Sequence, residues 1–227
     1  MTPGAAYTTA VGVLAVANVT GNLWLPSWSY LPVNLAAAAL LLTVATRGGA
    51  GADDLGLRRD RIGRGMTTGL LIALGVAALI AAAAALPATR GFFEDDRAGG
   101  IALGGLLYQA LARIPLGTAL FEEVAFRGVL LGLGLRLWTT TRAVWVSSLL
   151  FGLWHVFPAL SAAEENTAVT RVNAALVVLV AVVATVVAGL IFARVRLRSQ
   201  HLVTTVLMHA ATNSFSFTAA WLVLRAA

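Results

Sequence analysis

The feature that most constrains this chain is a series of apolar stretches, each of about 18 residues or more, that recurs along its length. As a helix, a stretch of that length crosses the roughly 30 Å hydrocarbon core of a bilayer. Charged residues make up only 11% of the 227 residues, whereas a soluble domain usually carries about 25%. The sequence therefore predicts an all-α fold, a polytopic bundle of transmembrane helices. No linker divides the chain, so residues 1–227 are expected to form a single integral membrane domain.

We expect about seven spans, at residues 5–23, 29–46, 66–88, 115–137, 143–160, 171–193 and 201–224. The segment "GGIALGGLLYQALARIP" lies between the third and the fourth and is short for a span. It could form an interfacial amphipathic helix, a re-entrant segment or an eighth span. Gln109 and Arg113 favour the interfacial helix, because both side chains are polar.

The basic residues are concentrated in three loops that fall on one side of a seven-span bundle. All sixteen are Arg, and ten of them (five, two and three) lie in residues 47–64, 136–142 and 194–198. Loops rich in Lys and Arg stay on the cytoplasmic side, so we expect a multi-pass protein of the plasma membrane with a cytoplasmic N-terminus. Contact with anionic lipid headgroups explains the net charge of +6, so we expect the bilayer, and no nucleic acid, as a partner.

Three polar groups interrupt the apolar stretches where charge is most costly. They lie in "ALFEEVAFRGVLL", "FGLWH" and "HAATN", and their polar residues are Glu122, Glu123, Arg127, His155, His209 and Asn213. Intramembrane polar residues usually face a bundle interior or a cavity and are candidates for a functional site. Counted from the nearest arginine of the three loops, Glu123, His155 and His209 lie 13, 13 and 11 residues away, which is roughly 16–20 Å at the helical rise. Their shared depth predicts one site built by converging helices.

The spacing of these residues indicates their chemical roles. Glu123 and Arg127 are i,i+4 and can pair along one helix face, where a buried pair is a better clamp than a source of stability. Glu122 points roughly 100° away around the helix and has no partner within it, which suits a general base or acid. His209 and Asn213 are also i,i+4, and the amide of Asn213 can donate to a developing oxyanion.

Together these residue types indicate a water-activating hydrolytic site, and they could equally bind a metal. Zn²⁺ accepts His nitrogen and Glu oxygen as ligands, so Glu122, His155 and His209 could hold zinc or another divalent metal, or none. No H-E-x-x-H sequence is present, which excludes the usual zincin arrangement. The chain has no Cys, which excludes disulfides and thiolate chemistry.

The three motifs resemble those of a known family of intramembrane proteases. "EEVAFR", "FGLWH" and "HAATN" are similar, in the same order, to the E-E-x-x-x-R, F-x-x-x-H and H-x-x-x-N motifs of the CAAX protease and bacteriocin-processing (Abi) family. The resemblance covers about residues 98–215. It implies that the protein is an endopeptidase acting on peptide or protein substrates in or at the membrane.

The resemblance also implies a role for each motif residue. Glu122 and His155 match the family residues that position and activate water. His209 and Asn213 match those that stabilise the oxyanion. The residues that match the orienting groups are Glu123 and Arg127. A catalytic metal is neither required nor excluded by the motifs.

Other interpretations of these residues are a structural ion-pair network and hydrogen-bonded packing between helices. At the level of function, the alternatives are a non-catalytic bacteriocin-immunity or regulatory protein of the same fold, and a small proton-coupled transporter. A transporter is less favoured because the sequence shows no broken helices in two matching halves. His201 lies beside a basic loop and is expected at the membrane interface. No nucleophile motif surrounds Ser147, Ser148 or Ser214.

Overall fold

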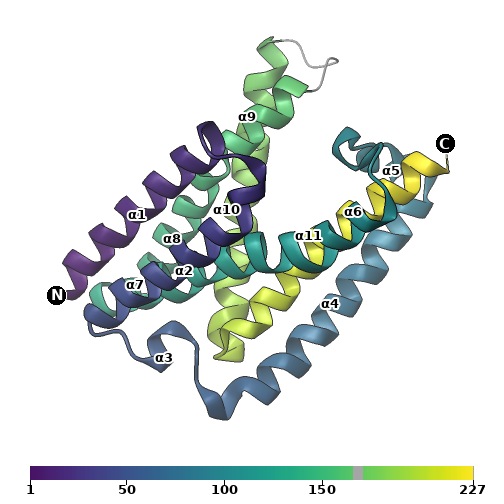
Figure 1. Ribbon diagram of the computed structural model, residues 1–227. Coiled ribbons are helices and arrows are strands. Elements are labelled where there is room, and N and C mark those ends of the chain that lie inside the picture. The colour runs from purple at the N-terminus through teal and green to yellow at the C-terminus, as the bar shows by residue number, and fades with distance from the viewer. Residues whose placement is uncertain (166–170, 227) are drawn as a thin grey trace.

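The computed structural model describes residues 1–165 and 171–226, and in this part the chain is helical apart from short connections (Figure 1). The helices are α1 Pro3–Leu23, η1 Ser27–Ser29, α2 Tyr30–Arg47, α3 Ala52–Leu55, η2 Arg59–Arg61, α4 Ile62–Ala85, α5 Pro87–Arg90, η3 Gly91–Phe93, η4 Asp96–Ala98, α6 Leu103–Tyr108, η5 Gln109–Leu120, η6 Glu123–Leu130, α7 Leu131–Leu137, α8 Thr140–Trp154, α9 Val156–Glu165, α10 Arg171–Ser199 and α11 Leu202–Arg225.

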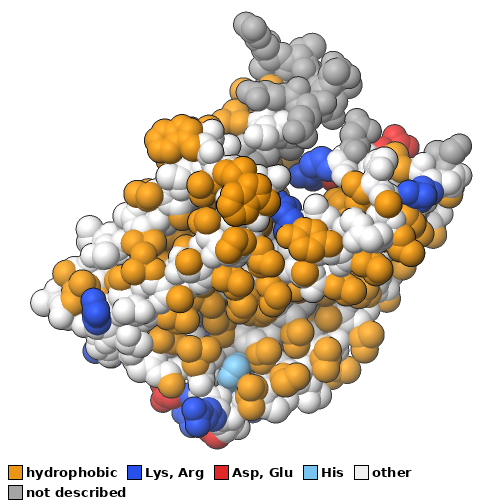
Figure 2. Space-filling view, viewed as in Figure 1, with side chains coloured by type: hydrophobic (Ala, Val, Ile, Leu, Met, Phe, Trp, Pro, Cys, Tyr) orange, Lys and Arg blue, Asp and Glu red, His pale blue; other side chains and the backbone are white. Residues whose placement is uncertain are grey.

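Several of these helices are suited to a bilayer. Among the described residues, those long and apolar enough to cross a membrane are Ser27–Arg47, Arg59–Ala85, Thr140–Ser161 and Ala174–Ser199. Large apolar side chains are exposed along α4, including Leu71, Leu74 and Leu79, and Figure 2 shows hydrophobic side chains over much of one face. A soluble monomer rarely exposes so much apolar surface. The all-α membrane fold is confirmed, and the count of seven spans stays a prediction.

The segment before the fourth expected span does not form a separate helix. From Leu103 to Leu137 the chain runs as one helix, with π-helical turns in η5 and η6. Pro115 lies inside this run, although proline lacks an N–H donor and clashes with the preceding turn of an α-helix. The π-helix changes the hydrogen-bonding pattern to i→i+5, and here the helix passes through the proline. Our prediction that this span begins at 115 and follows an interfacial helix is therefore wrong.

The second half of this helix forms the centre of the molecule. Every residue of η6 is buried, and α1, α2, α8 and α11 pack around it. Phe126 of η6 lies with its ring centroid 5.1 Å from that of Phe151 on α8, and the Phe126 carbonyl accepts a 2.8 Å hydrogen bond from Ser147 Oγ. Charged residues of η6 therefore lie among packed helices and away from lipid.

The three arginine-rich loops meet at one end of the bundle. Arg136 Nη1 donates to Asp54 Oδ2 at 3.1 Å, and Arg196 Nη2 donates to the Asp54 carbonyl at 3.0 Å. The backbone N–H of Leu202 donates to the Gly56 carbonyl at 2.8 Å. These contacts hold α3 across the ends of α7, α10 and α11, on the side where the sequence places the basic loops together.

The two ends of the chain lie at opposite ends of the bundle (Figure 1). Near the N-terminus, the Tyr7 ring contacts the Trp138 ring edge-on, with centroids 4.9 Å apart, and Trp138 follows α7 at the arginine-rich end. Near the C-terminus, Arg225 Nη2 donates to the Ile101 carbonyl at 2.9 Å. An odd number of membrane crossings would produce this arrangement.

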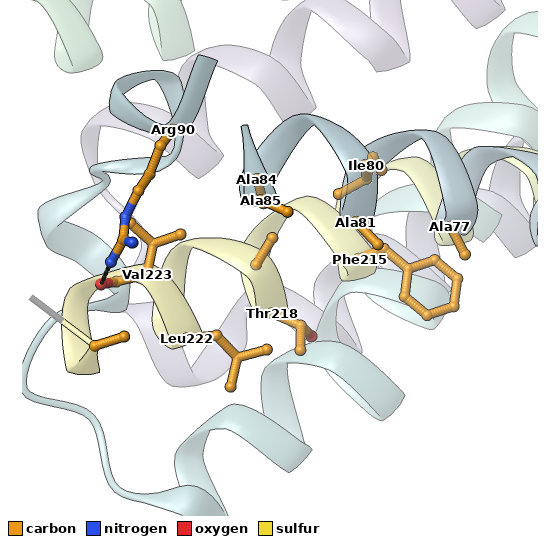
Figure 3. Close-up of a pocket in the computed structure, with 12 residues that line it drawn as sticks. Ala77, Ile80, Ala81, Ala84, Ala85, Arg90, Phe215, Thr218, Leu222 and Val223 are labelled. Carbon is orange, nitrogen blue, oxygen red and sulfur yellow. Dashed lines mark hydrogen bonds between the residues drawn. The ribbon is translucent and has the colours of Figure 1, made fainter. Parts of the chain in front are cut away.

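A cavity separates part of α4 from α11 (Figure 3). Near the arginine-rich end the two helices touch, since a Cβ added at Gly69 would lie 2.9 Å from Leu207 Cδ1. Further along, small side chains leave a cavity of about 380 Å³, and Arg90 lies at its wall with Nη2 donating to the Val223 carbonyl at 3.3 Å. None of the polar motif residues lines this cavity. It is therefore distinct from the candidate site.

Two glycines one turn apart face α3, and the docking of α3 on α7 depends on the second of them, Gly132. A Cβ at Gly132 would lie 2.6 Å from the Asp54 carbonyl oxygen, which is backbone and cannot rotate away, whereas a Cβ at Gly128 meets nothing closer than 3.6 Å. We therefore expect Gly132→Ala to lower the free energy of unfolding by about 1–3 kcal/mol and Gly128→Ala to leave it unchanged or raise it slightly. Thermal unfolding of both variants in detergent compares them. Equal effects would show that α3 does not dock as described.

Candidate active site

Two adjacent glutamates carry the site, and the helix directs them to different partners. Glu122 lies at the start of η6 and Glu123 is the first residue within it. Their exposed fractions are 4% and 0%. A carboxylate this deep requires compensating hydrogen bonds or charges, so the partners of each one define its role.

Glu123 belongs to a compact ionic network. Its Oε1 accepts hydrogen bonds from Arg127 Nη1 and from His209 Nδ1, both at 2.9 Å. The Arg127 guanidinium lies over the Phe151 ring, with Cζ 3.9 Å from the centroid, and 4.9 Å from the centroid of Phe192. Arg127 is 1% exposed. The i,i+4 pair expected from the sequence is formed, and it fixes one imidazole nitrogen of α11.

Glu122 presents one oxygen to an indole and the other to two imidazoles. Its Oε1 accepts a hydrogen bond from Trp154 Nε1 at 3.2 Å. Its Oε2 lies 3.8 Å from His155 Nε2 and 3.8 Å from His209 Nε2. Both distances exceed a hydrogen bond, and within the described part of the chain this buried oxygen has no hydrogen-bond partner. Glu122 Oε2 is thus a basic atom facing two further nitrogen atoms.

The outer bonds of the two imidazoles fix which nitrogen carries the proton. His155 Nδ1 lies 2.8 Å from the Phe151 carbonyl, and a carbonyl only accepts, so we assign the hydrogen to Nδ1. His209 Nδ1 faces Glu123 Oε1, and the same reasoning applies. Each neutral ring therefore turns the lone pair of Nε2 toward Glu122 Oε2. The site presents three hydrogen-bond acceptors to one point, which suits a molecule that donates.

Asn213 is not hydrogen-bonded to this cluster. It lies one turn after His209 on α11 and is half-buried, but its side chain makes no hydrogen bond to any residue that the structure describes. The structure thus brings together the other five motif residues, which are Glu122, Glu123, Arg127, His155 and His209.

His201 does not join the site. It is 6% exposed, and its Nδ1 accepts from the Val203 N–H at 3.0 Å as the N-cap of α11. Its position at the level of the membrane interface stays a prediction. The three serines each donate to a backbone carbonyl: Ser147 to Phe126, Ser148 to Val144 and Ser214 to Ala110.

Sequence reasoning did not identify Trp154 or Tyr30 as site residues. Trp154 lies within the motif "FGLWH", and its position directly before His155 was the available signal. Tyr30 is at the start of α2 and interacts electrostatically with Glu122, while its hydroxyl lies 3.0 Å from Thr118 Oγ1. No local pattern links Tyr30 to a glutamate on a helix so far along the sequence.

The cluster contains side chains of the types that bind metals, but they are not arranged as metal ligands. A carboxylate oxygen and two imidazole nitrogens are suitable ligands for zinc. Among the described residues, however, no three His, Cys, Asp or Glu side chains are placed so that they could hold a metal ion. As placed, Glu122, His155 and His209 do not fit a metal.

One comparison with known proteins found a match, and it covers the segment that holds the site. Residues 104–215 match the family model described as "Type II CAAX prenyl endopeptidase Rce1-like", and this segment contains all three motifs, from Glu122 to Asn213. No curated protein and no solved structure matches the chain. Over residues 104–215, the chain is therefore similar to the Rce1-like family of type II CAAX prenyl endopeptidases.

Proposed function

We propose that the protein is an intramembrane endopeptidase that hydrolyses peptide bonds of membrane-associated substrates. The observation that carries the proposal is the buried, unbonded Glu122 Oε2, which faces two imidazole Nε2 atoms at 3.8 Å each. The Rce1-like family match supports a peptide substrate at the membrane. The gathered arginine-rich loops support a multi-pass protein of the plasma membrane with this end, and so the N-terminus, in the cytoplasm.

The acceptors around Glu122 Oε2 suit a water molecule as the nucleophile. Water can donate one hydrogen bond to Glu122 Oε2 and the other to His155 Nε2, spanning a separation too long for direct contact. As the water oxygen bonds to the scissile carbonyl carbon, Glu122 takes one proton. Glu122 then returns this proton to the amide nitrogen as the C–N bond breaks. The hydroxyl ends on the new carboxyl group and the proton on the new amine.

The other residues of the cluster position these groups. Trp154 holds one oxygen of Glu122, which aims the other at the reacting point. Glu123 and Arg127 hold His209 through Nδ1. We assign His209 and Asn213 to the oxyanion. The amide N–H of Asn213 is a suitable donor to the charge that develops on the carbonyl oxygen. His209 Nε2 accepts in the neutral ring and becomes a donor only when the imidazole takes up a second proton.

Peptide cleavage by the purified protein in liposomes tests the proposal, with the histidines as matched variants. A library of membrane-anchored, fluorescence-quenched peptides supplies the substrates. We expect wild type to cleave at least one of them. We expect His155→Gln to lower kcat about 10²- to 10⁴-fold, because the water loses the imidazole that orients it for proton transfer to Glu122. His201→Asn is the control, because asparagine also caps helices well, and it should retain cleavage.

Two outcomes would contradict the proposal. The first is that wild type cleaves no peptide of the library while its thermal unfolding is cooperative. The second is that His155→Gln cleaves as fast as His201→Asn, which would leave the Glu122 cluster without a part in the reaction.

A further inference from the structure

Arg113 of η5 is a cation in an apolar part of the helix. Leu111 and Leu116 beside it are exposed, at 71% and 43%, as expected of side chains that face lipid. An arginine within the membrane-spanning part of a helix usually pairs with an acid or faces a cavity. Arg113 is half-buried, and no carboxylate of the described residues forms an ion pair with it. Its recorded hydrogen bond is a long one of 3.4 Å, from Nη1 to Gln109 Oε1.

A rigid platform holds this guanidinium. Arg113 Cζ lies 4.1 Å from the centroid of the Tyr30 ring. Tyr30 is fixed against η5, because its hydroxyl lies 3.0 Å from Thr118 Oγ1 and Asn34 Nδ2 donates to the Gly117 carbonyl at 2.9 Å. Stacking on a ring leaves the edge of the guanidinium plane, with most of its N–H donors, open to another group.

This platform adjoins the candidate active site. Tyr30, which stacks on Arg113, also lies within electrostatic range of Glu122. Arg113 precedes Glu122 by nine residues on the same helix, which is at most about 14 Å along the axis. A bound peptide could reach both residues.

We propose that Arg113 binds a carboxylate of the substrate, and that the enzyme thereby selects peptides with a negative charge close to the cleaved bond. The inference rests on the proposed function. An extended peptide advances about 3.3–3.6 Å per residue, so this carboxylate lies up to about four residues from the scissile bond. A planar guanidinium with open donors matches a carboxylate in a bidentate pair. The carboxylate belongs either to the end of the substrate chain or to an Asp or Glu side chain.

Three forms of one cleaved library peptide test the inference. The first ends in a free carboxylate, the second in a carboxamide, and the third is a carboxamide with Asp placed up to four residues after the cleaved bond. For wild type, we expect KM of the carboxamide to exceed that of the better anionic form by about 10- to 100-fold, the range of a hydrogen-bonded charge pair. The two anionic forms, compared with each other, identify the source of the carboxylate.

Arg113 variants then assign the effect to this residue. Arg113→Gln should raise KM for the anionic peptide to that of the carboxamide, with kcat little changed, and Arg113→Lys should retain part of the preference. Arg90→Gln is the control, because Arg90 lines the separate cavity between α4 and α11. Equal KM values for all three peptides in wild type, or a uniform loss of kcat in Arg113→Gln, would overturn the inference and leave the proposed function standing. Failure of wild type to cleave any peptide would instead overturn the proposed function.

Discussion

Replacing Glu122 with Gln should reduce kcat for peptide cleavage about 10²- to 10⁴-fold, the usual contribution of a positioned general base. The amide oxygen can still accept from Trp154, so the side chain keeps its place. The amide cannot take a proton from water, however. Its NH₂ group would instead donate toward the Nε2 atoms of His155 and His209, which now face Glu122 Oε2 at 3.8 Å. We therefore expect thermal stability equal to or above that of wild type.

Loss of activity with retained stability distinguishes a removed base from a damaged fold. Single-turnover cleavage and thermal unfolding, measured on the same preparation, give both quantities. Glu94→Gln is the matched control, because Glu94 is an exposed acid in the connection between α5 and α6 and its loss should change neither. If Glu122→Gln kept wild-type kcat, the base would have to be another group, and His155 would be the next candidate.

The polar cluster could be predicted from the sequence, because the length of the apolar stretches and the rarity of polar residues within them are strong signals. A helix long enough to cross the bilayer is recognisable from composition alone. Glu122, His155 and His209 are each the kind of residue that such a helix excludes unless it has a use. The similar distances of Glu123, His155 and His209 from the basic loops indicated convergence. The structure places the side chains of Glu122, His155 and His209 around one point.

Other features depend on information that local patterns do not carry. Pro115 usually marks the first turn of a helix, so the sequence indicated a boundary there, whereas π-helical turns carry the chain through it. Trp154 and Tyr30 are ordinary aromatic residues of a membrane protein. Their roles follow from side-chain orientation and from pairing between α2, η5 and α8, which only the packed structure reveals.

The buried pair of Glu123 and Arg127 should give the largest stability effects, and the two single variants should differ. Glu123→Gln leaves a fully buried guanidinium without its counter-charge, and arginine cannot lose its proton to compensate. We expect a loss of about 3–5 kcal/mol in the free energy of unfolding. Arg127→Met leaves Glu123 bonded to His209 at 2.9 Å. Because this imidazole can take up a proton, or the carboxylate can itself be protonated, the loss should be smaller.

The double variant Glu123→Gln/Arg127→Met separates the value of the pair from the penalty of a lone charge. It removes both charges and places an apolar chain between the rings of Phe151 and Phe192, so it should recover most of the stability lost in Glu123→Gln. Cleavage should stay low, because His209 then lacks the carboxylate that holds its Nδ1. Unfolding midpoints of the four proteins in detergent, analysed as a double-mutant cycle, measure this coupling. Additive losses of stability in the double variant would mean that the two side chains do not share the network described here. Recovered stability without recovered cleavage would show that the ion pair positions His209 and is not needed to hold the fold together.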